Sequence, residues 1–183
     1  MSNWFVALSV PGAPWFSRVA DPPDGVRLFH PDDLHITVAF LGACGEQAAE
    51  AAFEIAPKWP TASLDVTLGA VEPMGNPRRP NAFAAIVRDR DDVLRDAILA
   101  VRDEMCERAG ARIEVRAPKP HVTIARPRRS AKGPTLRAAI GWARSLPIGE
   151  PRVSLTRLVL YGHSVDRTVR LFREHAVREL GST

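Results

Sequence analysis

Cysteine is scarce in this sequence. Its 183 residues include two cysteines, Cys44 and Cys106, which lie far apart and have neither a metal-ligand spacing nor a histidine cluster beside them. Such a pair is typical of reduced thiols in a cytosolic protein, whereas disulfide-rich and zinc-binding domains use several closely spaced cysteines. We therefore expect a cytoplasmic protein with no disulfide framework and no metal site.

Long apolar runs and the signatures of several enzyme classes are missing as well. No stretch approaches transmembrane length, and the N-terminus lacks a basic segment followed by an apolar one, so we expect no membrane partner. There is no Gly-x-Ser-x-Gly elbow, Walker-type phosphate loop, His-Glu-x-x-His motif or dinucleotide-binding glycine pattern. These absences argue against serine hydrolases, P-loop enzymes, zinc proteases and nucleotide-cofactor oxidoreductases.

The composition that remains is that of a globular protein with a mild positive charge. Hydrophobic residues make up 45% of the chain and charged residues 25%. The net charge of +4 and the pI near 9.7 are compatible with a polyanionic ligand but do not prove nucleic-acid binding. We expect residues 1–183 to form a single domain, because no segment is typical of a linker, and a monomer is the default expectation.

Two short segments share one pattern of residues. Residues 35–39 and 121–125 each contain, in order, His, a β-branched apolar residue, Thr, a β-branched apolar residue and Ala. Side chains alternate between the faces of a strand, so Phe40 is expected on the apolar face with Ile36. The residues expected on the opposite, exposed face are His35, Thr37, Ala39, His121, Thr123 and Ala125.

If both strands face one cleft, the site contains two imidazoles and two hydroxyl groups. One histidine can accept a proton while the other donates one, because both titrate near neutral pH. The hydroxyls of Thr37 and Thr123 can hydrogen-bond the oxygens of a tetrahedral anion. A lone strand histidine is usually a solvated residue, but two copies in the same frame are hard to attribute to packing. The pair favours attack of water on a phosphodiester with no metal and no other cofactor.

The chain resembles the two-histidine phosphoesterase superfamily, and within it the RNA 2′,3′-cyclic phosphodiesterases, also called 2′-5′ RNA ligases. The segments that carry this resemblance are 4–7 with Pro11, 31–42, Arg79-Pro80, 120–126 and 158–164. The resemblance implies an α+β, bilobal fold in which two antiparallel sheets face a central cleft and the helices lie outside. Each lobe would contribute one His-x-Thr motif.

The resemblance also implies roles for particular residues. His35 and His121 would be the acid/base pair, with His121 activating water and His35 protonating the leaving 3′ oxygen. Thr37 and Thr123 would bind the phosphate. The ligands would be RNA ends or nucleotides that carry a 2′,3′-cyclic phosphate, and the product a 2′-phosphate.

Three arginines are further candidates for substrate binding. Arg126 follows the second motif, where the family commonly has arginine, but strict alternation places it on the face opposite His121. A role in phosphate binding therefore requires the strand to twist or end at this point, next to Pro127. Arg27 and Arg79 are candidates for contacts with phosphate or ribose.

Two alternatives remain open at this point. The same residues could catalyse reversible 2′-5′ ligation of RNA ends, or the cleft could bind RNA or a nucleotide without turnover. The sequence does not identify the natural substrate; the rings of Phe5, Phe83 and Tyr161 are candidates for contact with the base. His163 could reach the site, but we expect it to lie in a turn. His30 and His175 have no partner motif, and we interpret them as structural.

Hydrophobic patterns predict the secondary structure around the motifs. The expected strands are 4–10, 26–29, 34–42, 64–71, 82–88, 121–126, 152–161 and 168–176. The expected helices are 46–59, 91–109 and one that begins near Pro134. The basic, proline-containing segment 75–80 is expected to be a solvated loop. This order suggests two similar halves, each with one histidine strand and one nearby helix.

Overall fold

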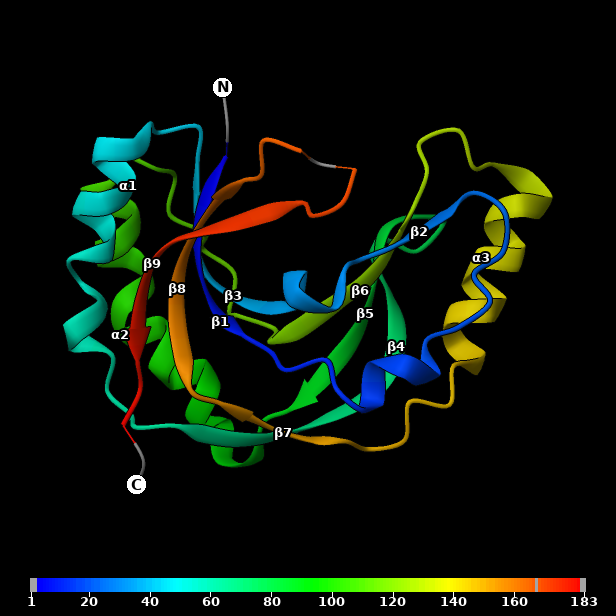
Figure 1. Cartoon of the computed structure of the whole chain (residues 1–183), viewed down its shortest axis with the longest axis horizontal. Helices are drawn as coiled ribbons and strands as arrows, with labels where there is room; N and C mark the ends of the chain where they lie inside the picture. The colour runs from blue at the N-terminus through cyan, green and yellow to red at the C-terminus, as the bar shows by residue number, and fades with distance from the viewer. Residues whose placement is uncertain (1–2, 167, 182–183) are drawn as a thin grey trace.

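Two antiparallel sheets face each other in the computed structural model, which describes residues 3–166 and 168–181 (Figure 1). The first sheet has the strand order β3 (His35–Gly42), β1 (Trp4–Ser9), β8 (Arg157–His163), β9 (Phe172–Glu179). The second has the order β2 (Val26–Leu28), β6 (His121–Pro127), β5 (Arg79–Arg88), β4 (Leu64–Asn76), β7 (Arg152–Leu155). Each sheet contains one of the two histidine strands.

The helices cover the outer faces of the sheets. Helices α1 (Glu46–Phe53) and α2 (Val93–Arg108) contact each other and the first sheet, and α3 (Gly133–Ser145) contacts β4 of the second (Figure 1). The buried residues of α2 recur with helical spacing, as the sequence predicted: Leu94, Ala97, Ile98, Val101 and Met105. No helix within the described residues is long and apolar enough to cross a membrane. Cys44 and Cys106 are both free thiols.

The two similar halves suggested by the order of the elements do not correspond to two consecutive pieces of the chain. The chain enters the first sheet with β1, crosses to the second with β2, and returns with β3. It then builds β4 to β7 in the second sheet before it ends in the first with β8 and β9. Helix α2 follows β5 of the second sheet but packs against β3 of the first. The tertiary fold therefore decides which sheet packs against the apolar face of α2.

Several predicted boundaries differ from the structure. Helix α1 ends at Phe53, and a separate 3-10 turn follows at Ala56–Lys58, because Pro57 cannot donate a backbone hydrogen bond. The predicted strand 152–161 is interrupted after Leu155: β7 belongs to the second sheet and β8 to the first. The predicted strand 168–176 begins only at Phe172.

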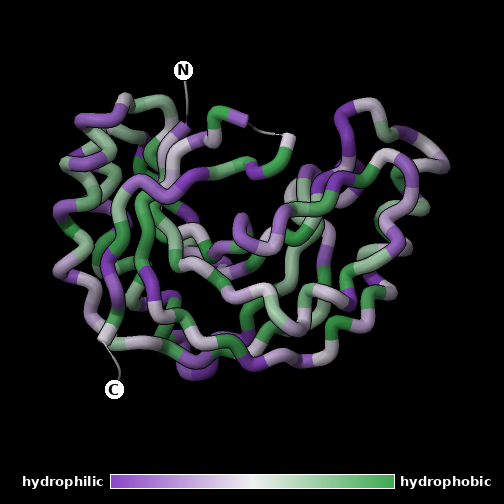
Figure 2. The backbone as a smooth tube through the Cα atoms, viewed as in Figure 1, coloured by the Kyte–Doolittle hydropathy of each residue, from purple (hydrophilic) through white to green (hydrophobic). Residues whose placement is uncertain are grey.

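The segment expected to be a loop at 75–80 is a tight hairpin. Strand β4 continues to Asn76 and β5 begins at Arg79, so that these two residues pair across a two-residue turn. Hydrophobic residues follow the central strands of both sheets, whereas the loop after β6, at the upper right of the view, is hydrophilic (Figure 2). The hairpin and this loop place arginines at one end of the second sheet.

Candidate active site

Both motif histidines are anchored in the same way. Nδ1 of His35 lies 2.7 Å from the carbonyl oxygen of Asp33, and Nδ1 of His121 lies 2.7 Å from that of Lys119. A carbonyl oxygen can only accept a hydrogen bond, so Nδ1 carries the hydrogen in each ring. Nε2, at the other edge of the ring, therefore keeps its lone pair in the neutral form. Both rings are held with one nitrogen available for proton transfer.

A register shift interrupts the first motif directly after its threonine. Neighbouring residues of β1 pair with Thr37 and Ala39, so Val38 has no partner in the ladder. Such a bulge places two consecutive residues on one side of a strand. Val38 and Ala39 are both buried, while Phe40 is 57% exposed and shares the exposed side with Thr37. The expectation that Ala39 faces the cleft and Phe40 the core is therefore wrong.

The second motif contains the same irregularity. Neighbouring residues of β5 pair with Thr123 and Ala125, and Ile124 is skipped. Ile124 and Ala125 are both buried, so Ala125 also departs from the expected alternation. The extra residue returns Arg126 to the face that carries His121 and Thr123. The bulge thus removes the geometric objection to a role for Arg126 in the site.

Residues of both sheets line one cavity of about 260 Å³. His35 and Thr37 contribute from β3, and Arg27 and Arg126 from β2 and β6. Arg27 and Arg126 are direct partners in the antiparallel pair, which places their side chains next to each other on one face. His121 is not in the wall of this cavity, although it lies on the same face of β6 as Arg126. The first motif and two of the three predicted arginines therefore meet.

His35 is enclosed by aromatic rings. Its ring centre lies 4.8 Å from that of Phe5, 5.9 Å from Tyr161 and 5.3 Å from Phe172. This burial lowers the pKa of His35 from 6.5 to about 4, because desolvation penalises the charged ring; the hydrogen bond to the Asp33 carbonyl opposes this effect. The charges of Arg126 and His121 lower the pKa further, so His121 is within electrostatic reach of His35.

Arg126 is itself held by an aromatic ring. Its guanidinium carbon lies 5.5 Å from the centre of the Phe29 ring, a cation–π distance. Phe29 is buried, and its backbone N–H donates to the carbonyl oxygen of Ile124 at 2.9 Å, within the bulge. The contact fixes a positive charge at the edge of the cleft, where an anionic ligand would meet it.

Solved structures share this architecture, whereas no family model and none of the curated sequences matches the chain. A phosphoesterase is 20% identical over 100% of both chains, with a TM-score of 0.71. LigT of E. coli, in complex with 3′-AMP, is 20% identical over 99% of both chains, with a TM-score of 0.69. TT0787 of Thermus thermophilus is 17% identical over 99% of this chain and 100% of its own, with a TM-score of 0.68.

The chain has the LigT-like fold. This confirms the expected α+β class, with two antiparallel sheets facing a central cleft and helices outside. LigT has also been solved in complex with NADP+, at 21% identity and a TM-score of 0.69.

Arg79 lies outside the cavity that contains His35. It lines a neighbouring cavity of about 320 Å³, together with Arg126, Arg128 and Arg129. Its Nη2 donates to the carbonyl oxygen of Arg129 at 3.5 Å. Arg126 contributes to the walls of both cavities. The structure thus separates Arg79 from the histidine and threonine of the first motif.

Two of the three aromatic candidates, and His163, differ from the sequence expectations. Phe83 and Tyr161 are buried, at 0% and 1% exposure, so neither ring is accessible to a base, whereas Phe5 lines the cavity. His163 is the last residue of β8, lines the same cavity, and stacks on Phe172 with ring centres 6.0 Å apart. His163 therefore does not lie in a turn. The signal in the sequence for its place in the cavity was that it belongs to segment 158–164, one of the segments that carry the family resemblance.

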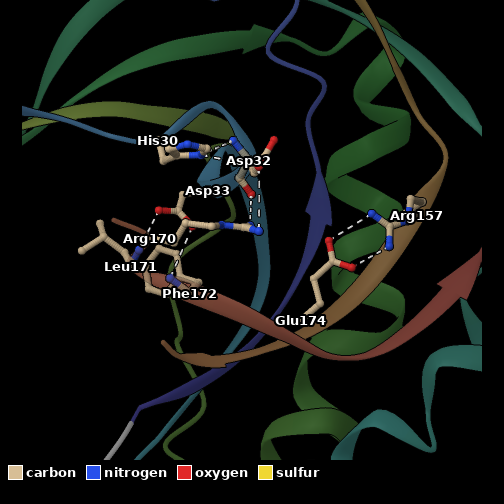
Figure 3. A network of polar contacts seen from close by, with 8 residues as sticks. All are labelled: His30, Asp32, Asp33, Arg157, Arg170, Leu171, Phe172 and Glu174. Atoms are coloured by element: carbon tan, nitrogen blue, oxygen red, sulfur yellow. Dashed lines mark hydrogen bonds and ion pairs between the residues drawn. The ribbon is translucent and has the colours of Figure 1, made fainter. Parts of the chain in front are cut away.

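Asp33 connects the first motif to β9. The carboxylate, 1% exposed, accepts hydrogen bonds from the backbone N–H groups of Leu171 at 2.7 Å and Phe172 at 3.3 Å (Figure 3). Nε of Arg170 lies 3.5 Å from the same carboxylate. The carbonyl group of Asp33 anchors His35. Asp33 therefore positions both His35 and Phe172, and the ring of Phe172 packs against that of His35.

The remaining histidines lie outside the cavity. Nδ1 of His30 accepts a hydrogen bond from the backbone N–H of Asp32 at 3.2 Å. His175 lies beside α1, with Nε2 2.9 Å from Glu50, and forms with Glu46 and Glu50 a group whose ligand atoms lie within 4.8 Å of one another. Such a group could hold a cation, but both glutamates are exposed and His175 already bonds to one of them. We assign no metal site to it.

Proposed function

We propose that this protein is a two-histidine phosphoesterase that hydrolyses a 2′,3′-cyclic phosphate on RNA or a nucleotide to a 2′-phosphate, without a metal ion. The observation that carries the proposal is the identical anchoring of His35 and His121 through Nδ1, which leaves Nε2 of both rings for proton transfer. The LigT-like fold and the arginines beside the cleft support a phosphate-containing ligand. The complexes of LigT with 3′-AMP and NADP+ support a nucleotide.

The proposed reaction is an in-line displacement at phosphorus. Nε2 of His121 accepts a proton from water as the water oxygen bonds to phosphorus. The bond from phosphorus to the 3′ oxygen breaks, and Nε2 of protonated His35 donates its proton to that oxygen. The hydroxyls of Thr37 and Thr123 and the Arg126 guanidinium stabilise the charge on the non-bridging oxygens. His121 then releases its proton to solvent, which returns both histidines to the neutral form of the free protein.

This assignment requires His35 to take up a proton when the substrate binds. Burial keeps the pKa of His35 at about 4 in the free protein, so the ring is neutral at pH 7. A bound phosphate places negative charge beside the ring. This charge raises the pKa of His35 and so opposes the effect of Arg126, which lowers it. The pH profile of kcat should therefore report a higher pKa for the acid than the profile of kcat/KM does.

The test is hydrolysis of a short RNA that ends in a 2′,3′-cyclic phosphate, in excess chelator. We expect turnover to a 2′-phosphate by the wild type and a loss of ~10²–10⁴ in rate for both His35→Ala and His121→Ala. His175→Ala is the matched control, because this histidine lies beside α1 outside the cavity, and it should retain wild-type turnover.

Three results would contradict the proposal. A folded wild type that binds the RNA and leaves it intact would favour the binding-module alternative. Turnover that survives either alanine substitution would remove the histidine from the mechanism. Joining of a 5′-hydroxyl RNA under conditions where water does not react would favour 2′-5′ ligation, which microscopic reversibility allows with the same residues.

A further inference from the structure

A second basic cavity lies next to the catalytic cleft. It has a volume of about 320 Å³, and its arginines are Arg79 from β5, Arg126 from β6, and Arg128 and Arg129 from the loop after β6. Arg126 is shared with the cavity that contains His35 and Thr37. A ligand that occupies both cavities would therefore pass Arg126 and meet arginine side chains along its whole length.

No acidic side chain of the described residues pairs with three of the four arginines of this cavity. Its wall has no Asp or Glu, and within residues 3–166 and 168–181 no ion pair involves Arg79, Arg128 or Arg129. Arg128 also borders a neighbouring cavity with Asp24, but the two side chains form no ion pair. Eight other arginines of the described residues form ion pairs, as Arg88 does with Glu150 at 2.6 Å. Like charges that converge repel each other, so an anion is the complementary ligand.

Backbone hydrogen bonds hold the loop that carries Arg128 and Arg129. The N–H of Arg128 donates to the carbonyl oxygen of Gly25 at 2.7 Å, and that of Ala131 donates to Arg128 at 2.9 Å. Pro80 and Pro127 restrict the chain on either side of the cavity. The adjoining first turn of α3 contains no acidic residue. A preformed pocket costs less ordering entropy when a ligand binds.

We propose that this cavity is a subsite for a second phosphate of the substrate, the phosphodiester on the 5′ side of the terminal nucleoside. The inference rests on the proposed function, because it places the reacting cyclic phosphate at His35 and His121. Arginine is suited to the second group, since its planar guanidinium can donate two hydrogen bonds to one phosphate. The preferred substrate is therefore the end of an RNA chain, and a mononucleoside cyclic phosphate occupies only part of the site.

Three substrates with the same terminal nucleoside 2′,3′-cyclic phosphate isolate the second charge. The first is the mononucleotide, the second is the dinucleotide, and the third is the dinucleotide with a neutral methylphosphonate linkage. We expect kcat/KM to be about tenfold higher for the charged dinucleotide than for the other two. The dependence of log kcat/KM on log salt should also be steeper for the charged dinucleotide, by about 0.7.

The variant Arg128→Gln/Arg129→Gln locates the subsite. We expect it to abolish the advantage of the charged dinucleotide and the additional salt dependence. The matched control is Arg108→Gln/Arg144→Gln, which removes the same net charge from exposed positions at the ends of α2 and α3. The control should retain the preference for the charged dinucleotide.

Two results would overturn the subsite. One is equal kcat/KM for the charged and neutral dinucleotides in the wild type, and the other is the same loss in the control as in Arg128→Gln/Arg129→Gln. If the wild type turns over none of the substrates, the proposed function fails. Fluorescence anisotropy with a labelled 3′-phosphorylated dinucleotide, competed by a nucleoside 3′-phosphate, then tests the subsite by affinity alone, and equal affinities would exclude it.

Discussion

His35 and His121 share a motif and an anchoring hydrogen bond but not an environment. Phe5, Tyr161 and Phe172 surround His35, and this burial holds its pKa at about 4, well below the usual 6.5. In the unfolded chain the same ring would titrate near 6.5. Between these two pH values the unfolded state binds more protons than the folded state does, so folding stability depends on pH through this one side chain.

We predict that His35 makes the protein less stable as the pH falls from 6.5 to 4. The free energy of unfolding should decrease by about 3 kcal/mol over this interval, because the folded state keeps His35 neutral while the unfolded state becomes protonated. Above pH 6.5 the contribution should be constant. Urea denaturation of the wild type and of His35→Gln at several pH values measures this effect.

His35→Gln should lose most of that pH dependence, because glutamine does not titrate. His121→Gln is the matched control, since it removes a histidine with the same motif and the same type of carbonyl anchor. An unchanged slope in His35→Gln would show that the ring is not desolvated in the folded protein.

At the level of the elements, a bulge after each threonine organises both histidine strands. It directs His35, Thr37 and Phe40 to one side of β3, and His121, Thr123 and Arg126 to one side of β6. Equivalent positions in the two strands thus present an aromatic ring in one sheet and a guanidinium group in the other. The difference gives the cleft an apolar side and a positively charged side.

The link between Asp33 and β9 should affect both stability and the histidine. Asp33→Asn keeps the size of the side chain but replaces one acceptor oxygen by an NH2 group, which cannot bind the N–H of Leu171 or Phe172. We expect a loss of about 1–3 kcal/mol in the free energy of unfolding. We also expect a changed pH profile of kcat, because the negative charge of Asp33 raises the pKa of His35.

Asp32→Asn provides the control for this variant. Asp32 is the neighbouring residue in the same 3-10 turn, but it is exposed, and its carbonyl oxygen, which the substitution retains, accepts from Arg170 at 2.8 Å (Figure 3). It should keep the wild-type pH profile. A profile for Asp33→Asn that coincides with that of Asp32→Asn would limit Asp33 to a purely structural role.

In the whole molecule, the chain passes repeatedly between the two sheets. Strands of the second sheet separate β1 from β3, and β3 from β8, in the sequence. Neither sheet can be completed by a continuous half of the chain. The two histidines therefore come together only when both sheets form, which couples assembly of the site to folding of the whole chain.

We predict that the two lobes unfold in one cooperative transition. Trp4 lies in β1 of the first sheet and Trp142 in α3 beside the second, so fluorescence of Trp4→Phe and Trp142→Phe weights the two lobes differently. The urea midpoint from fluorescence should equal that from far-UV circular dichroism in each variant. Separate midpoints would show that the lobes unfold independently.

The sequence by itself determined much of the local structure and predicted the residues of the proposed site. The repeated His-x-Thr pattern predicted both histidine strands, and the apolar spacing in 91–109 predicted α2. These features are visible because a strand or helix imposes its period on consecutive residues. The family resemblance implied the α+β class and the two facing sheets, which the LigT-like fold confirms.

Only the tertiary structure decided which residues share a face or a cavity. Strict alternation placed Phe40 in the core and Arg126 opposite His121, but a bulge is an irregularity in pairing with a neighbouring strand, and one strand's pattern does not encode it. The division of 152–161 between two sheets likewise depends on which strands lie alongside. The low pKa of His35 arises from aromatic rings of β1, β8 and β9 that lie far from it in the sequence but next to it in the fold.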